Sequence, residues 1–440
     1  MTSQHPKIVS AEEAAALVQP GDWVDYGLNL AQPDLFDRAL AARKAELRDV
    51  KVRHCLSLKP RAILEADPDG QHFQSFSWHF SARDRVDHDA GRTGYIPMNF
   101  GEAPDYYRRF VEPPDVVCIK TCPMDAHGYF NFSANVTYLK ALTERTRRLV
   151  IETSPRLPYV YGGEESVHAS EVDCVIDGPD EPLPELVNPE PNEVDRKVAS
   201  LIAAELEDGT CLQIGIGGMP NAVCGSLRDA GLRDLGIHTE MLVDGMIDLI
   251  ESGIVTGARK ALNRFVSVFT FALGSRRLYD FIDRNPRAQS FPVDYTNLPS
   301  QIMQNERVAA INNTTQLDLQ GQAASESDGH RHLTGTGGQL QFMRGAYASK
   351  GGKSFLCLSS VYERKGQRKS RIVSALTPGS VCTTPRTDVM YVVTEYGMVN
   401  LKGKSVAERA KALIGIAHPD FREPLSREAR EKNLVPRGYL

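Results

Sequence analysis

Short continuous apolar runs alternate along the chain with segments whose apolar residues recur at helical spacing. Residues 147–153, 353–360 and 388–394 are short β-branched runs, as expected for strands that are buried on both faces of a parallel sheet. Residues 192–207 and 405–417 instead show the period of amphipathic helices. The alternation predicts an α/β fold, in which ligands bind at the carboxyl ends of the strands.

A proline-rich stretch divides the chain into two flanks. Five prolines fall between residues 177 and 197, where they fix φ and remove backbone donors. Such a stretch cannot be a helix interior or a central strand. We therefore predict one domain over 1–178, an extended linker over 179–193 and a second domain over 194–440.

The two flanks resemble one another. Residues 10–29 and 195–217 each contain a helical pattern, a glycine, a short strand and a second glycine six residues after the first. A second match pairs residues 113–123 with residues 386–396, each an apolar strand after an aspartate. The two matches favour a duplicated α/β architecture, although helix–glycine–strand units are common enough for chance similarity to remain the alternative.

Composition and charge exclude several classes of protein. The 440 residues contain 51 Lys+Arg and 56 Asp+Glu, a net charge of −5, whereas nucleic-acid binders usually carry a strongly basic domain. No apolar run approaches the roughly 20 residues that span a bilayer, and the amino terminus lacks a signal-peptide pattern. We expect a cytoplasmic protein with neither nucleic-acid nor membrane partners.

The eight cysteines are scattered along the chain. Cys118 and Cys122 are spaced like metal ligands and have His127 nearby, but a zinc site usually needs a second such cluster, and the sequence has none. We expect free thiols in a reducing cytoplasm and no bound metal.

A glycine-rich turn follows the apolar residues 211–214. Glycines there let the backbone approach a ligand closely, and the N–H groups could receive a phosphate or a developing oxyanion. The dinucleotide fingerprint fails because Pro220 occupies its third glycine position. A purely structural turn is equally consistent with this segment.

Glu240 lies among apolar residues directly after a predicted turn. A carboxylate in such dry surroundings can act as a general base or a nucleophile, although a hydrogen-bonded structural glutamate would show the same pattern. His238 would point to the opposite side of a strand, which argues against a His–Glu catalytic pair.

Other polar candidates follow glycines or strand ends. Gly338 lies in a glycine pair, and Lys350 and Lys365 lie in basic segments that suit a phosphate-bearing ligand or a solvated surface. Asn312 and Glu395 each follow an apolar strand, which is where α/β enzymes place site residues as well as structural ones.

These segments together resemble the acetyl-CoA hydrolase/transferase family, specifically bacterial CoA-transferases of the 4-hydroxybutyrate and butyryl-CoA:acetate type. The resemblance runs from about Pro6 to Pro424 and rests on motifs such as GIHTEMLVDGMIDL, GTGGQLQFMRGAYASKGGKS and VVTEYGMVNLKGKS. It implies two similar CoA-transferase-type α/β domains with the active site at their interface. The first would cover the carboxylate pocket, and the second would carry the nucleophile and the CoA-binding loops.

The resemblance also implies a role for each candidate residue. Glu240 would be the nucleophile that forms a glutamyl-CoA thioester, with Asn312 and Glu395 as auxiliary polar residues. Gly338 would approach the CoA thioester, Thr315 would line the CoA channel, and Lys350 and Lys365 would meet the CoA phosphates. The CoA-binding loop would comprise Gly215, Ile216, Gly217, Gly218 and Met219.

The reaction implied is transfer of CoA from an acyl-CoA to a short-chain carboxylate, with CoA as a substrate and no permanently bound cofactor. Acetate, butyrate, 4-hydroxybutyrate, itaconate and succinate all remain possible acceptors. Residues 106–109, YYRR, could bind a second carboxylate or could form the exposed face of an amphipathic helix. The alternative activity is acyl-CoA hydrolysis through the same intermediate, and a sugar- or nucleotide-binding module is the non-enzyme alternative. The family resemblance further implies a homodimer or homotetramer.

Overall fold

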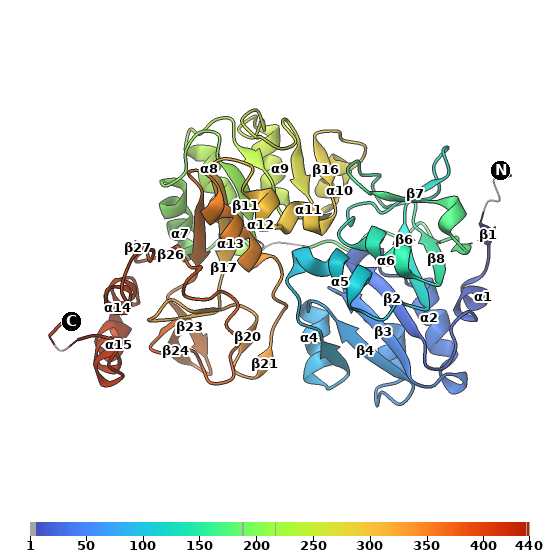
Figure 1. The fold of residues 1–440 in the computed structure, drawn as a ribbon, viewed down its shortest axis with the longest axis horizontal. Coiled ribbons are helices and arrows are strands. Elements are labelled where there is room, and N and C mark those ends of the chain that lie inside the picture. The colour runs from blue at the N-terminus through green and yellow to red at the C-terminus, as the bar shows by residue number, and fades with distance from the viewer. Residues whose placement is uncertain (1–5, 187–188, 216, 437, 440) are drawn as a thin grey trace. The chain divides into compact units, whose positions relative to one another are not determined.

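The computed structural model folds into two compact units (Figure 1). It describes residues 6–186, 189–215, 217–436 and 438–439. Unit 1 comprises residues 1–186 and 268–296, and unit 2 comprises residues 187–267 and 297–440. The segment 268–296 therefore packs with unit 1, whereas the sequence places it inside the predicted second domain.

Unit 1 is built on a parallel sheet. Its described residues form eight strands in the order β1-β10-β8-β6-β2-β3-β4-β5, and every neighbouring pair is parallel. The central strands β6 and β8 are almost wholly buried, as their β-branched sequences predict. The strands are β1 (Lys7–Ile8), β2 (Trp23–Leu28), β3 (Val50–Cys55), β4 (Phe73–Ser77), β5 (Thr93–Tyr95), β6 (Val116–Thr121), β8 (Arg148–Thr153) and β10 (Cys174–Ile176).

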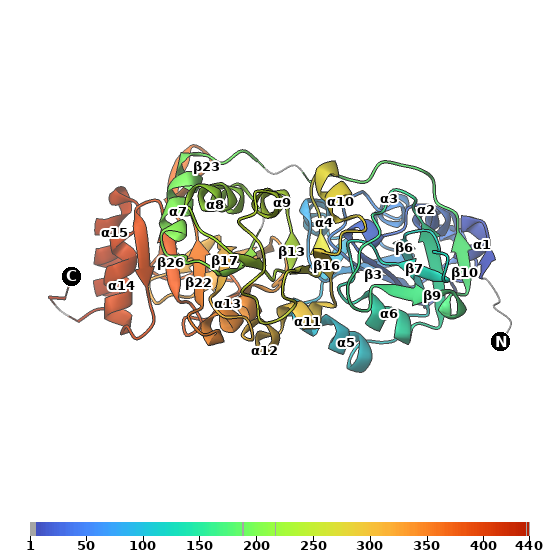
Figure 2. The same cartoon turned by 90° about the horizontal axis from the view of Figure 1, so that it is seen from above.

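Helices cover both faces of this sheet. Figure 2 shows α2 and α3 on one side of it and α5 and α6 on the other. Serine caps begin α1 and α4, where Ser10 and Ser81 each accept a backbone N–H and so satisfy a donor that the helix cannot pair. The helices are α1 (Ala11–Ala15), α2 (Leu35–Ala42), α3 (Ala62–Ala66), α4 (Ala82–Asp89), α5 (Ala103–Arg109), α6 (Leu139–Arg145), α10 (Arg276–Ile282) and α11 (Val293–Asn297), whose last residue, Asn297, belongs to unit 2.

Unit 2 repeats this architecture on a smaller scale. The described strands follow the order β12-β11-β17-β22-β26-β27, parallel except for the last pair. They are β11 (Cys211–Ile214), β12 (Gly236–Ile237), β17 (Val308–Asn313), β22 (Lys353–Cys357), β26 (Tyr391–Thr394) and β27 (Gly397–Asn400). The helices of unit 2 are α7 (Glu193–Ala203), α8 (Gly218–Asp229), α9 (Asp244–Glu251), α12 (Pro299–Ile302), α13 (Gln339–Ala348), α14 (Val406–Gly415) and α15 (Pro419–Glu431).

The predicted α/β class is confirmed, and α7 and α14 lie within the two segments with helical periodicity. In Figure 2 the sheet of unit 2 lies between α7, α8 and α9 on one side and α12 and α13 on the other. Among the described residues, no helix combines the length and the apolarity needed to cross a bilayer.

Short strands complete the two units. They are β7 (Tyr129–Asn131), β9 (Ser166–His168), β13 (Met241–Leu242), β14 (Ser267–Phe269), β15 (Phe271–Ala272), β16 (Ala288–Ser290), β18 (Gln316–Asp318), β19 (Ala323–Ala324), β20 (Ser327–Asp328), β21 (Arg331–His332), β23 (Val361–Arg364), β24 (Gln367–Ser370) and β25 (Ile372–Val373).

Both sheets reverse their strand order, at β2 in the middle of the unit 1 sheet and at β11 beside the edge strand of the unit 2 sheet. In unit 1 the chain adds β3, β4 and β5 on one side of β2 and then returns to place β6 on the other side. In unit 2 it adds β12 beside β11 and then places β17 on the other side. Loops diverge at such switch points and leave room for ligands at the carboxyl edge of the sheet.

Candidate active site

Glu240 lies in the short turn between β12 and β13, at the carboxyl edge of the unit 2 sheet. Two side-chain hydrogen bonds hold this turn. Thr239 Oγ1 donates to the Met241 carbonyl at 3.1 Å, and Lys260 Nζ donates to the Ile237 carbonyl at 2.8 Å. The strand and the buried Lys260 therefore fix the backbone on both sides of the carboxylate.

The Glu240 carboxyl group is poorly solvated. Burial raises its pKa to about 7, even though hydrogen bonds from the Asn297 side chain and the Gly338 backbone N–H favour the ionised form. Asn297 Nδ2 donates to Glu240 Oε2 at 2.5 Å. The site thus holds a carboxylate whose pKa is raised toward neutrality and which two donors orient.

Gly338 is a glycine because the carboxylate approaches it closely. It is the N-cap residue of α13, and a Cβ atom built there would overlap both Glu240 Oε2 and the Asn297 amide. The positive end of the α13 dipole lies at this position, where it stabilises negative charge. Any larger residue would displace the carboxylate from the helix N-terminus.

Asn297 is the site residue that sequence reasoning missed. It is the last residue of α11, is fully buried, and lies 57 positions from Glu240 in the chain. A single asparagine before Leu298 and Pro299 looks like ordinary helix-boundary chemistry. No pattern in the sequence separates it from other loop asparagines.

The predicted CoA-binding loop joins β11 to α8. Gly217 is the N-cap residue of α8 with φ of +117°, a conformation that other residues rarely adopt. Gly215 donates its N–H to the Ile311 carbonyl of β17 at 3.0 Å, so the loop begins beside the neighbouring strand. Gly218 and the buried Met219 open α8. Ile216, which we also predict in this loop, lies outside the described residues.

Asn312 and Glu395 both lie at the carboxyl edge, but their hydrogen bonds go elsewhere than to Glu240. Asn312 Nδ2 donates to Gln213 Oε1 at 3.0 Å, which links β17 to β11. Ser360 donates to Glu395 from its backbone N–H at 2.9 Å and from Oγ at 2.5 Å. Each side chain is thus bonded to a residue on or after the neighbouring strand, and the donors to Glu240 come from Asn297 and Gly338 instead.

Thr315 and Lys365 lie beyond the same sheet edge. Thr315 Oγ1 donates to the Ala324 carbonyl at 2.6 Å, and Arg371 donates to the Thr315 carbonyl at 3.0 Å. Arg371 follows the hairpin of β23 and β24, and Lys365 occupies the exposed turn of that hairpin with φ of +53°. These contacts connect the cationic hairpin to the loop that follows β17.

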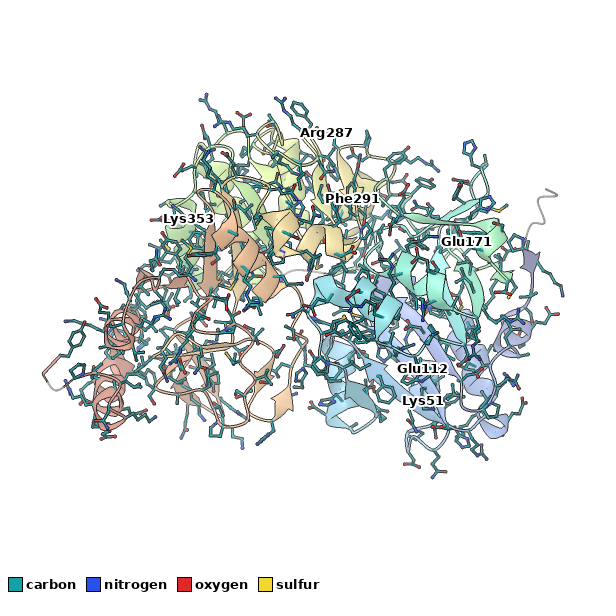
Figure 3. The ribbon with its side chains drawn as sticks, in the orientation of Figure 1. Lys51, Glu112, Glu171, Arg287, Phe291 and Lys353 are labelled. Atoms are coloured by element: carbon teal, nitrogen blue, oxygen red, sulfur yellow. The ribbon has the colours of Figure 1, made fainter. Side chains whose placement is uncertain are left out.

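Lys350 is not brought to this edge. It precedes β22 and therefore lies at the amino end of that strand, whereas Gly215, Asn312 and Glu395 follow strands. Its ammonium group is largely exposed and forms an ion pair with Glu306 at 3.0 Å. Lys353, labelled in Figure 3, lies at the same amino end and donates to Glu205.

The described residues contain no group of three or more His, Cys, Asp or Glu side chains that could hold a metal ion. What the site does offer is a poorly solvated carboxylate beside a helix N-terminus and a glycine loop after the adjacent strand. That combination suits covalent acyl chemistry with stabilisation of an oxyanion.

Comparison with known proteins finds the same family in both parts of the chain. Residues 2–186 match the acetyl-CoA hydrolase/transferase N-terminal domain, and residues 274–429 match the acetyl-CoA hydrolase/transferase C-terminal domain. The chain is 44% identical to a probable butyrate:acetyl-CoA coenzyme A-transferase of Syntrophomonas wolfei, covering 97% of this chain and 96% of the relative. It is 41% identical to a butyryl-CoA:acetate CoA-transferase of Anaerostipes caccae, covering 98% of both.

The solved structures agree in fold. The crystal structure of RipA from Yersinia pestis superposes with a TM-score of 0.90 at 37% identity, and 98% of each chain is covered. Both halves of the chain are thus accounted for, by sequence and by structure. The chain belongs to the acetyl-CoA hydrolase/transferase family.

Proposed function

We propose that the protein is a CoA-transferase that moves CoA from an acyl-CoA to a short-chain carboxylate through a covalent intermediate on Glu240. The observation that carries the proposal is the Glu240 carboxylate, with its pKa of about 7, held between Asn297 and the N-terminus of α13. The names of the similar proteins, which describe transfer of CoA between butyrate and acetate, agree with it.

The first half-reaction loads CoA onto the enzyme. Glu240 attacks the thioester carbonyl, and collapse of the tetrahedral intermediate breaks the C–S bond, giving an acyl-glutamyl anhydride and the CoA thiolate. The thiolate then attacks the glutamyl carbonyl and expels the first carboxylate. The product is a glutamyl-CoA thioester, and no proton is gained or lost in either step.

The second half-reaction reverses these steps with a new acid. The acceptor carboxylate attacks the glutamyl thioester and releases the thiolate, which attacks the acceptor's acyl carbon and restores the Glu240 carboxylate. Anhydride and thioester are both activated acyl groups, so the energy of the original thioester is retained and ATP is not needed.

Each step develops negative charge on a carbonyl oxygen. The Gly338 N–H and the Asn297 amide already donate to one oxygen of Glu240, so both are placed to stabilise an oxyanion on the glutamyl carbon. The glycine loop after β11 would bind CoA near Glu240, and Lys365 is a candidate for its phosphates. Asn312 and Glu395 would act as positioning residues at the ends of their strands.

The alternative activity is hydrolysis, in which water replaces the acceptor carboxylate. An initial-rate study with butyryl-CoA and acetate separates the two, because transfer predicts parallel double-reciprocal lines and acetyl-CoA as the product. Release of free CoA at the same rate without acetate would identify a hydrolase instead. A binding module without enzymatic activity would form no product under either condition.

We further propose a homodimer or homotetramer in the cytoplasm. The eight cysteines are all free, and all except Cys382 are buried, which suits a reducing compartment. Size-exclusion chromatography with light scattering tests the assembly, and a monomeric mass would contradict it.

A further inference from the structure

The backbone that presents the Gly338 N–H to Glu240 is rich in glycine. Three glycines fall within the four residues 335–338, which lead into α13. The Gly338 N–H belongs to the peptide that joins the glycine pair Gly337–Gly338, and Gly337 adopts φ of +59°, in the left-handed region. Because glycine-rich backbone has many accessible conformations, this peptide needs contacts from outside the segment to keep its direction.

One dipeptide, Ser325–Glu326, holds the residues on both sides of the glycine pair. On the amino side, the Thr336 hydroxyl donates to the Glu326 carboxyl group. On the carboxyl side, Gln339 Nε2 donates to Ser325 Oγ at 2.9 Å. These two hydrogen bonds form a clamp on the two flanks of the glycine pair.

The dipeptide is itself anchored within unit 2, to which all of these residues belong. Ser325 Oγ donates onward to Thr314 Oγ1 at 3.0 Å, and the Ser325 N–H donates to Thr383 Oγ1 at 3.0 Å. The Glu326 carbonyl accepts the Leu333 N–H at 2.8 Å, which closes the hairpin of β20 and β21 before α13 (Figure 1). The clamp is therefore fixed by contacts that do not depend on the glycine pair.

Gln339, the first residue of α13, is bonded a second time. Its Nε2 also donates to Thr384 Oγ1 at 3.0 Å, and the buried Thr384 donates its N–H to the Ala323 carbonyl at 3.1 Å. An amide nitrogen that donates twice has both of its hydrogens bonded. The first turn of α13 is thus held directly after Gly338.

Glu326 occupies a position where a carboxyl group is costly. Only 4% of the residue is exposed, and Oε2 finds no hydrogen-bond partner within the described part of the chain. Burial raises the pKa of Glu326, and the Thr336 hydroxyl offsets only part of that rise. Residues that break the usual rules of burial are concentrated at functional sites, where stability is not the only requirement.

We propose that Ser325 and Glu326 are positioning residues, which direct the Gly338 N–H at the oxyanion that forms on the glutamyl carbon. A hydrogen bond weakens steeply as the donor turns away from its acceptor, so rotation of the Gly337–Gly338 peptide would lose this stabilisation. The effect on catalysis rests on the proposed function. The hold on the backbone does not.

The first test removes each half of the clamp. Glu326→Leu removes the acceptor of the Thr336 hydroxyl, and kcat for transfer from butyryl-CoA to acetate should fall about tenfold. Ser325→Ala removes one acceptor of Gln339 and should lower kcat about threefold, because Thr384 still holds that side chain.

The Michaelis constant separates positioning from direct contact with CoA. Because the oxyanion forms only after the substrate is bound, KM for butyryl-CoA should change by less than about twofold in both variants. A raised KM with an unchanged kcat would overturn the inference and identify these residues as contacts of CoA.

Two further readouts separate positioning from a general loss of structure. The Gly338 N–H also favours the ionised form of Glu240, so kcat/KM of Glu326→Leu should rise at a higher pH than that of the wild type. Glu326→Gln keeps an oxygen that can accept from Thr336 and should restore kcat to within about twofold of the wild type. An unshifted pH profile, or a glutamine variant as slow as the leucine variant, would contradict the clamp.

Glu423→Leu is the matched control. It removes the same side chain from the exposed face of α15, where Glu423 forms an ion pair with Arg427 at 3.2 Å. Its kcat and pH profile should equal those of the wild type. A loss comparable to that of Glu326→Leu would show that the effect is not specific to the clamp and would overturn the inference.

Hydrogen exchange tests the clamp without any turnover. Mass spectrometry of a peptide that covers residues 333–342 reports how often this backbone opens. Exchange there should be about tenfold faster in Glu326→Leu, whereas Glu326→Gln and Glu423→Leu should match the wild type, even if Glu240 is not the nucleophile. Ser325→Ala gives the same comparison if the leucine variant does not fold. Unchanged exchange in the folded variants would overturn the inference and leave the CoA-transferase proposal standing.

Discussion

Glu240 is placed where ionisation is costly. Its pKa is raised from the usual 4.5 to about 7 because burial outweighs the two hydrogen bonds that favour its charge. A poorly solvated carboxylate is a better nucleophile than one surrounded by water, since less solvent must be removed before it attacks. The same burial should make the residue a cost to the stability of the fold.

Glu240→Gln should therefore stabilise the protein in a pH-dependent way. Below pH 4.5 the carboxyl is protonated in both the folded and the unfolded chain, so the wild-type ionisation costs nothing. As the pH rises from 4.5 to about 7, the unfolded chain ionises first, and the folded wild type loses stability relative to the variant. Above pH 7 the gap should be about 2–3 kcal/mol in the free energy of unfolding. Denaturant titrations at pH 5 and pH 8 measure it, and an equal gap at both would contradict the raised pKa.

Asn297 should set the pH at which the enzyme becomes active. The ionised carboxylate is the reactive form, so kcat/KM should rise with pH and level off above about 7. Asn297→Leu removes the donor to Glu240 and should move this rise upward by roughly one to two pH units, lowering the rate at pH 7 about tenfold. A pH profile of the variant checks this. A uniform loss of rate with no displacement of the profile would show that Asn297 does not act through the Glu240 pKa.

Glu240 and Asn297 show which single site residues a sequence can reveal. Glu240 could be predicted because a carboxylate within an apolar run violates the usual pattern of a surface residue. Asn297 could not, because its partner is 57 positions away and only folding brings the two together.

At the scale of elements, the start of α13 carries the chemistry. Gly338→Ala should leave the helix able to form, because the glycine has φ of −98°, which alanine adopts without strain. The added methyl group would overlap Glu240 and Asn297, and we expect kcat to fall by roughly two to three orders of magnitude, as for loss of an oxyanion donor.

The matched control for this variant is Gly415→Ala. Gly415 ends α14, and a Cβ atom built there meets no neighbouring atom within 4 Å. Its rate should equal that of the wild type. Similar rates for Gly338→Ala and Gly415→Ala would show that the close approach at Gly338 does not matter.

The predicted elements were most reliable where burial on two faces dictated the sequence. The runs at 147–153, 353–360 and 388–394 contain β8, β22 and β26. The edge of the sheet at which a residue lies was harder to predict from the sequence. Lys350 precedes β22 and so lies at the amino edge of the sheet. A glycine-rich basic segment by itself does not indicate which edge of the sheet it joins.

Of the two internal matches in the sequence, only one pairs strands at equivalent positions in the two sheets. The pairing of residues 10–29 with 195–217 corresponds to β2 and β11, and each of these strands lies at the switch point of its sheet. The pairing of residues 113–123 with 386–396 joins β6, which is next to β2, with β26, which is separated from β11 by β17 and β22. These strands are not equivalent in topology, so similarity of buried apolar strands produced a false match.

At the scale of the whole molecule, the chain does not divide at the proline-rich stretch alone. Residues 268–296 leave unit 2 in sequence and pack with unit 1, where the Ala272 N–H donates to the Ala134 carbonyl at 2.9 Å. The Tyr279 hydroxyl donates to the Pro184 carbonyl at 2.8 Å. The proline-rich stretch marks the point near residue 186 where the chain first passes from unit 1 to unit 2. The sequence around residues 268 and 296, where the chain passes between the units again, shows no such change in composition.

A fragment of residues 1–190 should therefore fold poorly. It lacks the segment that supplies β15, β16 and α10, so the surface that this segment covers in unit 1 would be exposed. The loss of cooperative thermal unfolding by circular dichroism, relative to the full chain, measures the effect. A fragment that unfolds cooperatively near the temperature of the full chain would show that 268–296 is dispensable for unit 1.

The central claim is covalent attachment of CoA to Glu240. Intact-protein mass spectrometry after incubation with butyryl-CoA should show an increase equal to CoA less one water, and peptide mapping should place it on Glu240. The adduct should disappear when acetate is added, with acetyl-CoA formed in its place, and should be absent from Glu240→Gln. A wild-type enzyme that turns over without any adduct, or an adduct on another residue, would contradict the account.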